Sequence, residues 1–523
     1  MDAAAPPRPH DQPHASRWII LGFLGLAQLM VVLDATIVNI ALPEAQKSLG
    51  FSIVDRQWLI TAYSLAFGSI LFLGGRLSDV IGRKTTLQIG LLGFAVASAI
   101  GGASTSFGML VTARAIQGAF GAILAPAALA LLTTTFTDPS ERGKAFGIYG
   151  SIAGAGAAVG LLLGGVLTEY LDWRWTLYVN LFFAGIAIVG TQILLVRERG
   201  VASKGLDIAS TLLISSGLFG IVYGLSHAAN VAETAQATGG SVTLASAFSN
   251  ATTIGCIAAG VALVGLFVWR QATATRPMLP LEVVADRARG GSFLAILLAA
   301  ASMFAVFLFL TYYLQNGLGY SPLKTGLSFM PMVIALVAAS ATSQIVLLPR
   351  LGPRPLVPVG MLFGATGMFL YTHITVAGDY ATQVLPALIV AGIGMGVVFS
   401  TAMNTATARV RAEYAGATSA TVNVVQQVGG SLGTALLSTV AVSALLANLN
   451  GSVHVATEGG KKLTTAALAV LTNAASVHGY TIGFRWAMVM FVIGGVVSLI
   501  VLPSGKPERS PVDHEREREL VAA

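Results

Sequence analysis

Two ionisable residues lie in otherwise apolar stretches, and these two could do chemistry. Asp34 falls in the apolar run 17–42 and Arg114 in the run 107–132. If each run is a helix across a membrane, Asp34 lies nine residues before Pro43 and Arg114 about seven residues into its own run. Both are then about 11–13 Å from the same membrane face, at 1.5 Å of rise per residue. Their side chains are therefore at a depth where they can pair.

A charge in hydrocarbon costs at least about 2.5–3.5 kcal/mol, so intramembrane charges usually pair, face a cavity and mark an ion pathway. A carboxylate beside an arginine is kept ionised, whereas separating the two or removing water favours the protonated form. We therefore expect Asp34 to take up and release a proton and Arg114 to control it. The alternative is a purely structural ion pair.

The composition shows which elements must hold these residues. The chain has 523 residues, of which 55% are hydrophobic and only 10% charged, against about 25% charged in a typical soluble domain. A helix needs about 20 apolar residues to cross the hydrocarbon, and continuous apolar runs favour helices over a barrel. The sequence predicts an all-α membrane protein with fourteen transmembrane helices. The fourteen runs are 17–42, 57–75, 86–104, 107–132, 144–167, 174–196, 207–227, 251–269, 291–314, 323–347, 355–374, 382–407, 416–447 and 481–503.

The basic residues predict the topology. If the N-terminus is inside, 22 of the 30 Lys and Arg fall on inner connections or tails and 7 on outer ones. This bias predicts that both termini are cytoplasmic and that the protein crosses the inner membrane of a cell many times. The net charge of +7 is then an orientation signal and does not indicate a nucleic-acid partner. Three connections are longer than turns, at 228–250, 270–290 and 448–480.

The sequence contains no set of residues typical of an enzyme. It has no G-x-x-x-x-G-K-[ST] loop for nucleotide phosphates, no G-x-S-x-G and no H-E-x-x-H. Its seven histidines fall in tails, loops or span ends, and its one cysteine, Cys256, rules out an intramolecular disulfide and a cysteine-based metal site. We expect a carrier with no metal and no organic cofactor. A channel is less suited to a buried acid–base pair than alternating access.

The short connection after the second span reads GRLSDVIGRK over 75–84. A glycine permits a tight turn there, and the charged side chains can form charge-assisted hydrogen bonds to neighbouring helix ends. This spacing resembles the signature loop of the major facilitator superfamily. The resemblance implies a cytoplasmic loop that gates the carrier, formed by Gly75, Asp79, Gly82, Arg83 and Lys84.

Other stretches resemble the fourteen-helix drug:proton antiporter branch of that superfamily. LDATIVNIALP over 33–43 resembles its helix 1 signature, and DWRW over 172–175 followed by Asn180 resembles the start of its helix 6. Leu110, Arg114, Gln117, Gly118 and Gly121 resemble the helix 4 signature, whose arginine is implicated in proton transfer. The resemblance covers essentially the whole chain.

Helix 5 departs from this pattern. The branch has a glycine stripe that contains Gly-Pro, and here Leu161 stands at the proline position. A stripe of small residues can also reflect close helix packing, and the missing proline leaves open whether transport is strict antiport. The stripe itself is kept at Gly156, Gly160, Gly164 and Gly165.

The resemblance also implies two six-helix bundles with an added pair of helices between them. Proton coupling is expected in the first bundle, because helix 12 has Leu388 at the counterpart of Arg114. In the connection 345–354, Gly352 and Arg354 match Gly82 and Lys84. The implied divisions are a disordered N-terminus, the first bundle, the linker with the added pair, the second bundle and the C-terminal tail, at 1–16, 17–200, 201–275, 276–503 and 504–523.

A substrate cavity between the two repeats is expected near the membrane midplane. Aromatic and methionine side chains accept varied apolar shapes, although each candidate can equally be a packing residue. Because Asp34 is the sole intramembrane acid, we expect neutral, amphipathic or monocationic substrates. The function predicted is proton-driven export of hydrophobic drugs, with export of one self-made antibiotic or lipid as the alternative. The candidate cavity residues are Gln28, Tyr63, Asn180, Phe304, Phe307, Tyr312, Met330, Asn404, Asn423, Gln426 and Gln427.

Overall fold

A computed structural model describes residues 14–136, 138–196, 207–237, 248–275, 277–408, 410, 415–457 and 464–504. Over these ranges the protein is built of helices joined by short connections, without a β-strand. The predicted disordered N-terminus and C-terminal tail lie almost wholly outside the described residues.

The helices follow the apolar runs of the sequence. The first half contains α1 (His14–Leu49), η2 (Asp55–Gln57), α2 (Trp58–Ile81), α3 (Arg83–Gly102), α4 (Phe107–Thr135), α5 (Pro139–Tyr170), α6 (Trp175–Leu194), α7 (Ile208–Ala237) and α9 (Ala251–Thr273). The second half contains α10 (Leu281–Ala285), α11 (Arg287–Tyr312), η3 (Tyr313–Gly317), α12 (Pro322–Ser328), α13 (Met330–Thr342), η4 (Ser343–Leu347), α14 (Leu348–Leu351), α15 (Pro353–Tyr371), η5 (Tyr380–Val384), α16 (Leu385–Thr407), α17 (Ala415–Thr457) and α18 (Thr465–Val501).

Polar residues at the ends of the apolar runs begin several of these helices. The side chains of Ser106, Asn250, Asp286 and Thr464 accept hydrogen bonds from backbone N–H groups in the first turns of α4, α9, α11 and α18. Such caps satisfy donors that have no partner within the helix. The start of each of these helices is therefore determined by a capping residue next to it in the sequence.

Among the described residues, twelve helices are long and apolar enough to cross a membrane. The fifth and eleventh predicted spans correspond to α5 and α15, which are helical but are not among those twelve. The all-α class is confirmed, and the count of fourteen spans stays a prediction. The run 323–347 is not one continuous α-helix, because it is divided among α12, α13 and η4.

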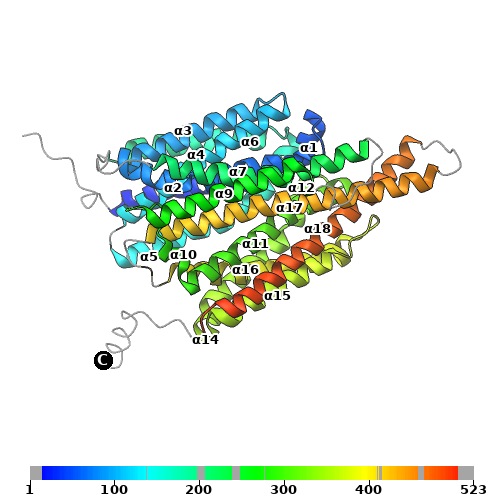
Figure 1. Ribbon diagram of the computed structural model, residues 1–523. Coiled ribbons are helices and arrows are strands. Elements are labelled where there is room, and N and C mark those ends of the chain that lie inside the picture. The colour runs from blue at the N-terminus through cyan, green and yellow to red at the C-terminus, as the bar shows by residue number, and fades with distance from the viewer. Residues whose placement is uncertain are drawn as a thin grey trace, which may run out of the picture.

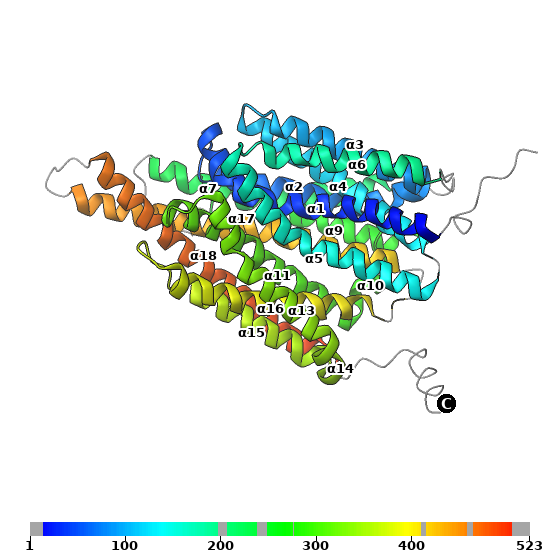
Figure 2. The same cartoon turned by 180° about the vertical axis from the view of Figure 1, so that it is seen from behind.

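Two groups of helices lie side by side (Figures 1 and 2). In one group α1 packs on α5 and α6, α2 on α4, and α3 on α4 and α6. In the other, α11 packs on α16, α17 and α18, and α15 on α16 and α18. We call these the first and second bundles. The hairpin of α7 and α9 lies against α2 and α17, where the two bundles meet.

The near end of the molecule is defined here as the end where α1 begins and α18 ends, and the far end is the opposite one. At the far end the orange hairpin of α17 and α18 projects beyond the other helices in Figure 1. The predicted connection 448–480 is wrong as a loop, because α17 continues to Thr457 and α18 already begins at Thr465. Likewise α7 extends ten residues into the predicted connection 228–250. Ala228 and Ala229 at the start of the α7 extension and Ala475 of α18 share one buried cluster with residues of α17.

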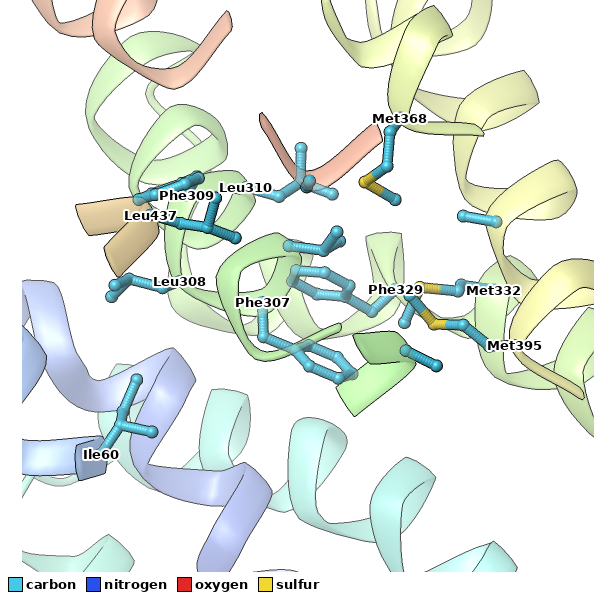
Figure 3. Packing of buried hydrophobic residues seen from close by; sticks show 14 of the residues in the cluster. Ile60, Phe307, Leu308, Phe309, Leu310, Phe329, Met332, Met368, Met395 and Leu437 are labelled. Atoms are coloured by element: carbon cyan, nitrogen blue, oxygen red, sulfur yellow. The ribbon is translucent and has the colours of Figure 1, made fainter. Parts of the chain in front are cut away.

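The core of the second bundle is aromatic and sulfur-rich. Figure 3 shows Phe307, Phe329, Met332 and Met395 packed together. Ile60 of α2, which Figure 3 shows apart from them below Leu308, belongs to the same buried cluster. The rings of Phe307 and Phe329 have centroids 5.3 Å apart. Burying apolar area of this kind contributes about 25 cal/mol per Å², and here it also joins the two bundles.

Two tight turns at the near end need glycine. Gly82 has φ of 91° between α2 and α3, and Gly352 has φ of 77° between α14 and α15. These values lie in the region that residues with a Cβ atom rarely adopt. The two glycines therefore make equivalent turns in the two bundles.

Candidate functional site

Asp34 and Arg114 are in direct contact at the middle of the first bundle. Arg114 Nη1 lies 2.6 Å from Asp34 Oδ2. The exposed fraction of the side chain is 0% for Asp34 and 3% for Arg114. The pair is thus shielded from solvent. Removing one partner of such a buried ion pair is strongly destabilising, because the other charge is left buried without a counter-charge.

The second carboxylate oxygen of Asp34 also has donors. Gln117 Nε2 donates to Oδ1 over 2.6 Å, and Asn180 Nδ2 donates to the same atom over 2.8 Å. Gln117 also accepts from Arg114 Nη1 over 2.6 Å and donates to Ser98 Oγ over 2.8 Å. Helices α1, α3, α4 and α6 therefore meet in one network around a single carboxylate.

Arg114 has two further contacts, both with α2. Its Nε donates to the carbonyl oxygen of Leu59 over 3.2 Å, and its guanidinium lies 4.4 Å from the ring centroid of Tyr63. A cation over an aromatic face is attracted by the ring. Arg114 therefore has acceptors available on α2 that do not depend on the charge of Asp34.

A small cavity of about 10 Å³ adjoins Arg114, lined by residues of α1, α2, α4 and α6 together with Trp173. This volume is close to what one water molecule needs. The indole Nε1 of Trp173 is buried and has no hydrogen-bond partner among the described residues. The walls of the cavity are almost wholly apolar, although Arg114, Trp173 and Thr176 are among the residues that line it.

The glycines of α5 lie against α1 on the turns that carry Asp34. A Cβ atom on Gly156 would lie 3.1 Å from Val32, and one on Gly164 would lie 2.9 Å from the carbonyl oxygen of Ile37. Gly160 faces Thr36, where an added Cβ would also lie 3.0 Å from the carbonyl oxygen of Leu33. The stripe therefore sets the distance between α5 and the helix of the proton-site candidate.

Another face of α5 approaches the second bundle. A Cβ atom on Gly165 would lie 2.7 Å from the Cα of Leu323, and the carbonyl of Leu161 lies against Gly326. Leu161, at the position where a proline was expected, is fully buried in this contact. Its side chain packs in the core that both bundles share.

The loop residues bind helix ends. Lys84 Nζ donates to the carbonyl oxygens of Gln192 and Leu195 at the end of α6, over 2.9 and 2.6 Å. In the second bundle Arg354 Nε donates to the carbonyl oxygen of Leu499 near the end of α18, over 3.3 Å. A cation at a helix C-terminus is favourable, and the matched pair makes the same contact in both bundles. The side chain of Asp79 lies outside the described residues, and Gly75 is half-buried in α2.

Four residues that the sequence suggested as lining a substrate cavity make contacts inside one bundle instead. Asn180 and Tyr63 belong to the network of Asp34 and Arg114. Gln28 accepts a hydrogen bond from the hydroxyl of Tyr149 over 2.8 Å, which joins α1 to α5. Phe307 is buried in the core of the second bundle.

The remaining candidates lie on helices of the second bundle. Phe304 and Met330 are half-buried, as are Gln426 and Gln427 on α17. Asn404 and Asn423 are exposed. Asn404 Nδ2 donates to Gln344 Oε1 over 3.1 Å, and Asn423 Nδ2 donates to the carbonyl oxygen of Ser419 over 3.0 Å.

The two bundles are held together at the far end. The hydroxyl of Tyr312 donates to Gln46 Oε1 over 2.6 Å, and Gln315 Nε2 donates to the carbonyl oxygen of Ile40 over 2.9 Å. Glu169 Oε2 accepts from the backbone N–H of Leu323 over 2.9 Å. These contacts join α1 and α5 of the first bundle to the helices of the second.

Several of these residues are not among the sequence candidates. Ser98 carries only a weak signal, a lone hydroxyl in an apolar run, and Gln46, Gln315 and Glu169 lie near span ends where polar residues are ordinary. The backbone carbonyls of Leu59 and Ile40 have no sequence signal at all. Their roles depend on which faces of the helices meet.

Comparisons with known proteins agree with this geometry. The model of the Major Facilitator Superfamily matches residues 24–434. The puromycin resistance protein of Streptomyces alboniger is 44% identical over 496 residues, which cover 94% of this chain and 92% of that protein. The cephamycin export protein of Amycolatopsis lactamdurans is 34% identical and covers 79% of this chain and 83% of its own length.

Solved structures show the same fold. A bacterial homologue of the human lysosomal transporter Spinster, in an inward-facing and occupied conformation, aligns with a TM-score of 0.65. It is 14% identical in sequence, and the alignment covers 96% of this chain and all of that one.

Proposed function

Because the chain belongs to the Major Facilitator Superfamily, we propose that protons drive its transport and that Asp34 is the residue they bind. The chain is a small-molecule efflux transporter of the membrane and not an enzyme, as its drug-export relatives show. The observation that carries the proposal is the network in which Asp34 accepts hydrogen bonds from Arg114, Gln117 and Asn180.

The network changes when a proton arrives. An ionised Asp34 accepts all three hydrogen bonds, whereas a protonated carboxyl is itself a donor and no longer attracts the guanidinium. A buried arginine without a counter-charge is costly, so Arg114 then relies on its contacts with Leu59 and Tyr63 of α2. Protonation thus weakens the contact between α4 and α1, and α4 is then held mainly by its contacts with α2. Such a change can bias two arrangements of the helices.

The direction of transport follows from topology. The distribution of basic residues supports a cytoplasmic near end, and with that orientation the contacts that join the bundles at the far end would close the outer side. Substrate would enter from the cytoplasm in this state and leave after the far end opens. Loss of the proton from Asp34 to the cytoplasm and uptake from outside would complete the exchange.

Two observations indicate the chemical class of the substrate. The names of the two relatives concern puromycin and cephamycin, and the part of the chain that the structure describes has a single fully buried acid, Asp34. We therefore propose neutral, amphipathic or monocationic antibiotics as substrates. A second candidate is export of one self-made antibiotic, which the export and resistance names of relatives from Streptomyces and Amycolatopsis favour. Uptake assays with a panel of unrelated antibiotics separate the two, since a dedicated exporter carries one class only.

Purified protein in liposomes with an imposed pH gradient tests the coupling, with labelled puromycin as the probe. Asp34→Asn should abolish gradient-driven accumulation of the probe while probe binding is retained. The matched control is Asp172→Asn, which alters a half-buried aspartate paired with Arg174 over 3.4 Å at the far end. If Asp34→Asn still accumulates the probe in response to the gradient, the proposal is wrong.

A further inference from the structure

A file of polar side chains lies where α2 meets α17. A Cβ atom on Gly68 of α2 would lie 3.4 Å from the Cβ of Gln427 and 3.3 Å from Val428 of α17, which sets the register of the two helices. The helices are antiparallel, since α2 runs toward the near end and α17 away from it. Successive turns toward the far end therefore bring Ser64 opposite Ser431, Thr61 opposite Thr434 and Gln57 opposite Ser438. We call the polar side chains of this contact the polar seam. Its members are Gln57, Thr61 and Ser64 on one side and Gln427, Ser431, Thr434 and Ser438 on the other.

The packing around the seam agrees with this register. Leu65 of α2 shares a buried cluster with Val428 and Ala435 of α17, one helix position away from the seam on each side. The segment η2, which contains Gln57, also contacts α17. The seam therefore runs from mid-depth to the far end.

Three hydroxyls of the seam and the amide group of Gln57 lack partners among the described residues. Thr61 Oγ1, Thr434 Oγ1 and Ser438 Oγ, and both amide atoms of Gln57, are buried without a hydrogen bond to any described residue. Their residues are between 0% and 3% exposed. Elsewhere in this protein Ser and Thr side chains bond the carbonyl one turn back, as Ser98, Thr191 and Thr439 do. Ser431 of the seam makes that bond too, to the carbonyl oxygen of Gln427 over 2.9 Å, but Thr61, Thr434 and Ser438 do not. Buried polar groups without a protein partner are usually satisfied by ordered water.

A charged residue stands at the far end of the seam. Arg56, next to Gln57, is 2% exposed and lies between the bundles, with its guanidinium 4.2 Å from the ring centroid of Tyr312 and 5.7 Å from that of Tyr480. Its Nε and Nη2 have no hydrogen-bond partner in the described part of the chain. It is also absent from the ion pairs found there. Among the described residues, this positive charge therefore has no ion-pair partner where the seam reaches the far end.

We propose that the polar seam binds a file of ordered water molecules and that Arg56 is the charge that keeps protons and other cations from passing along it. A positive charge beside a water file admits water and repels protons. A carrier driven by a gradient needs such a barrier, because a hydrated contact between moving bundles would otherwise leak the driving ion. The proposal concerns leakage through the closed contact and stands apart from the role of Asp34.

Passive proton leak tests this in liposomes that contain the full-length protein, a trapped pH-sensitive dye and no substrate. After a pH step, with the membrane potential clamped, Arg56→Gln should raise the leak rate at least about tenfold over the unmodified protein. Arg56→Lys should keep it at the original rate. The matched control is Arg174→Gln, which removes a far-end arginine that also lies over an aromatic ring, at 4.6 Å from Trp173, but is half-exposed.

A second substitution decides whether the seam carries the leak. Adding Thr61→Val and Thr434→Val to Arg56→Gln removes two hydroxyls at nearly constant volume and should return the leak to within about twofold of the original. An unchanged leak in Arg56→Gln, or a raised leak that survives the valine substitutions, overturns the proposal. For the unmodified protein, a density map that resolves ordered water around Asp34 but none between Thr61 and Thr434 overturns it as well, whatever the folding of the variants.

Discussion

Tyr312→Phe should open the far end of the transporter, and the effect can be worked out from one hydrogen bond. The hydroxyl of Tyr312 on α11 donates to Gln46 Oε1 on α1 over 2.6 Å, so this bond exists only while the bundles are closed at the far end. A net hydrogen bond contributes about 0.5–1.5 kcal/mol, and about 1.4 kcal/mol changes an equilibrium tenfold. The ratio of open to closed far ends should therefore rise about two- to twelvefold.

The neighbouring tyrosine is a close control. Tyr313 is also buried, and its hydroxyl donates to the carbonyl oxygen of Thr375 over 2.8 Å, but that bond stays within the second bundle. Tyr313→Phe removes the same atom from an adjacent position and should change the stability of the bundle without changing the far-end equilibrium.

The assay is a distance distribution between two spin labels at the far end. Labels at Ser48 and Lys324, both exposed, would report the separation of α1 from α12 in a background where the single cysteine, Cys256, is replaced by serine. Tyr312→Phe should increase the long-distance population and Tyr313→Phe should not. Equal distributions for the two variants would refute the assignment of Tyr312 to the far-end closure.

Three further predictions concern stability. Gly160→Ala should lower the free energy of unfolding by about 1–3 kcal/mol, because the added Cβ would press on α1. Gly185→Ala should be close to neutral in the same thermal-unfolding assay, because a Cβ atom there would have nothing within 4 Å. Burial raises the pKa of Asp207, but hydrogen bonds from neighbouring side chains more than offset this and leave the pKa below its ordinary value. Its contribution is therefore present above about pH 4 and lost as the pH falls further. Asp207→Asn should remove that part of the acid sensitivity in an unfolding series across pH. Lys84→Met should destabilise the end of α6 by about 1 kcal/mol, and Lys47→Met, at an exposed ion pair, should have a smaller effect in the same series.

The sequence predicts the helical class and the position of the charged pair because both depend on local signals. A run of about 20 apolar residues specifies a spanning helix whatever its neighbours are. A lone acid or base in such a run is costly enough to require a partner. Asp34 and Arg114 are identifiable for that reason, and the Asp34–Arg114 distance agrees with their predicted common depth.

The partners of the pair could not be predicted in the same way. Asn180 is readable as a polar residue in a span, but its contact with Asp34 depends on the rotation of α6 about its axis, which only packing decides. Tyr312 lies near the end of its run, where sequence cannot distinguish a cavity wall from a contact between bundles. Arg56 counts as a topology signal in the sequence, whereas in the structure it is buried, with its guanidinium against the rings of Tyr312 and Tyr480, which are far away in the chain.

One helix connects the proton-site candidate to the far-end closure. α1 carries Asp34, and further along the same helix the carbonyl of Ile40 and the side chain of Gln46 accept hydrogen bonds from the second bundle. Gln46 lies twelve residues beyond Asp34, about 18 Å along the axis. A proton that weakens the hold of α4 and α6 on α1 therefore acts on the element that keeps the far end closed. If Asp34 binds the proton as proposed, reciprocal coupling requires that opening the far end change how readily Asp34 gains a proton, and proton exchange would need that dependence to run in either direction.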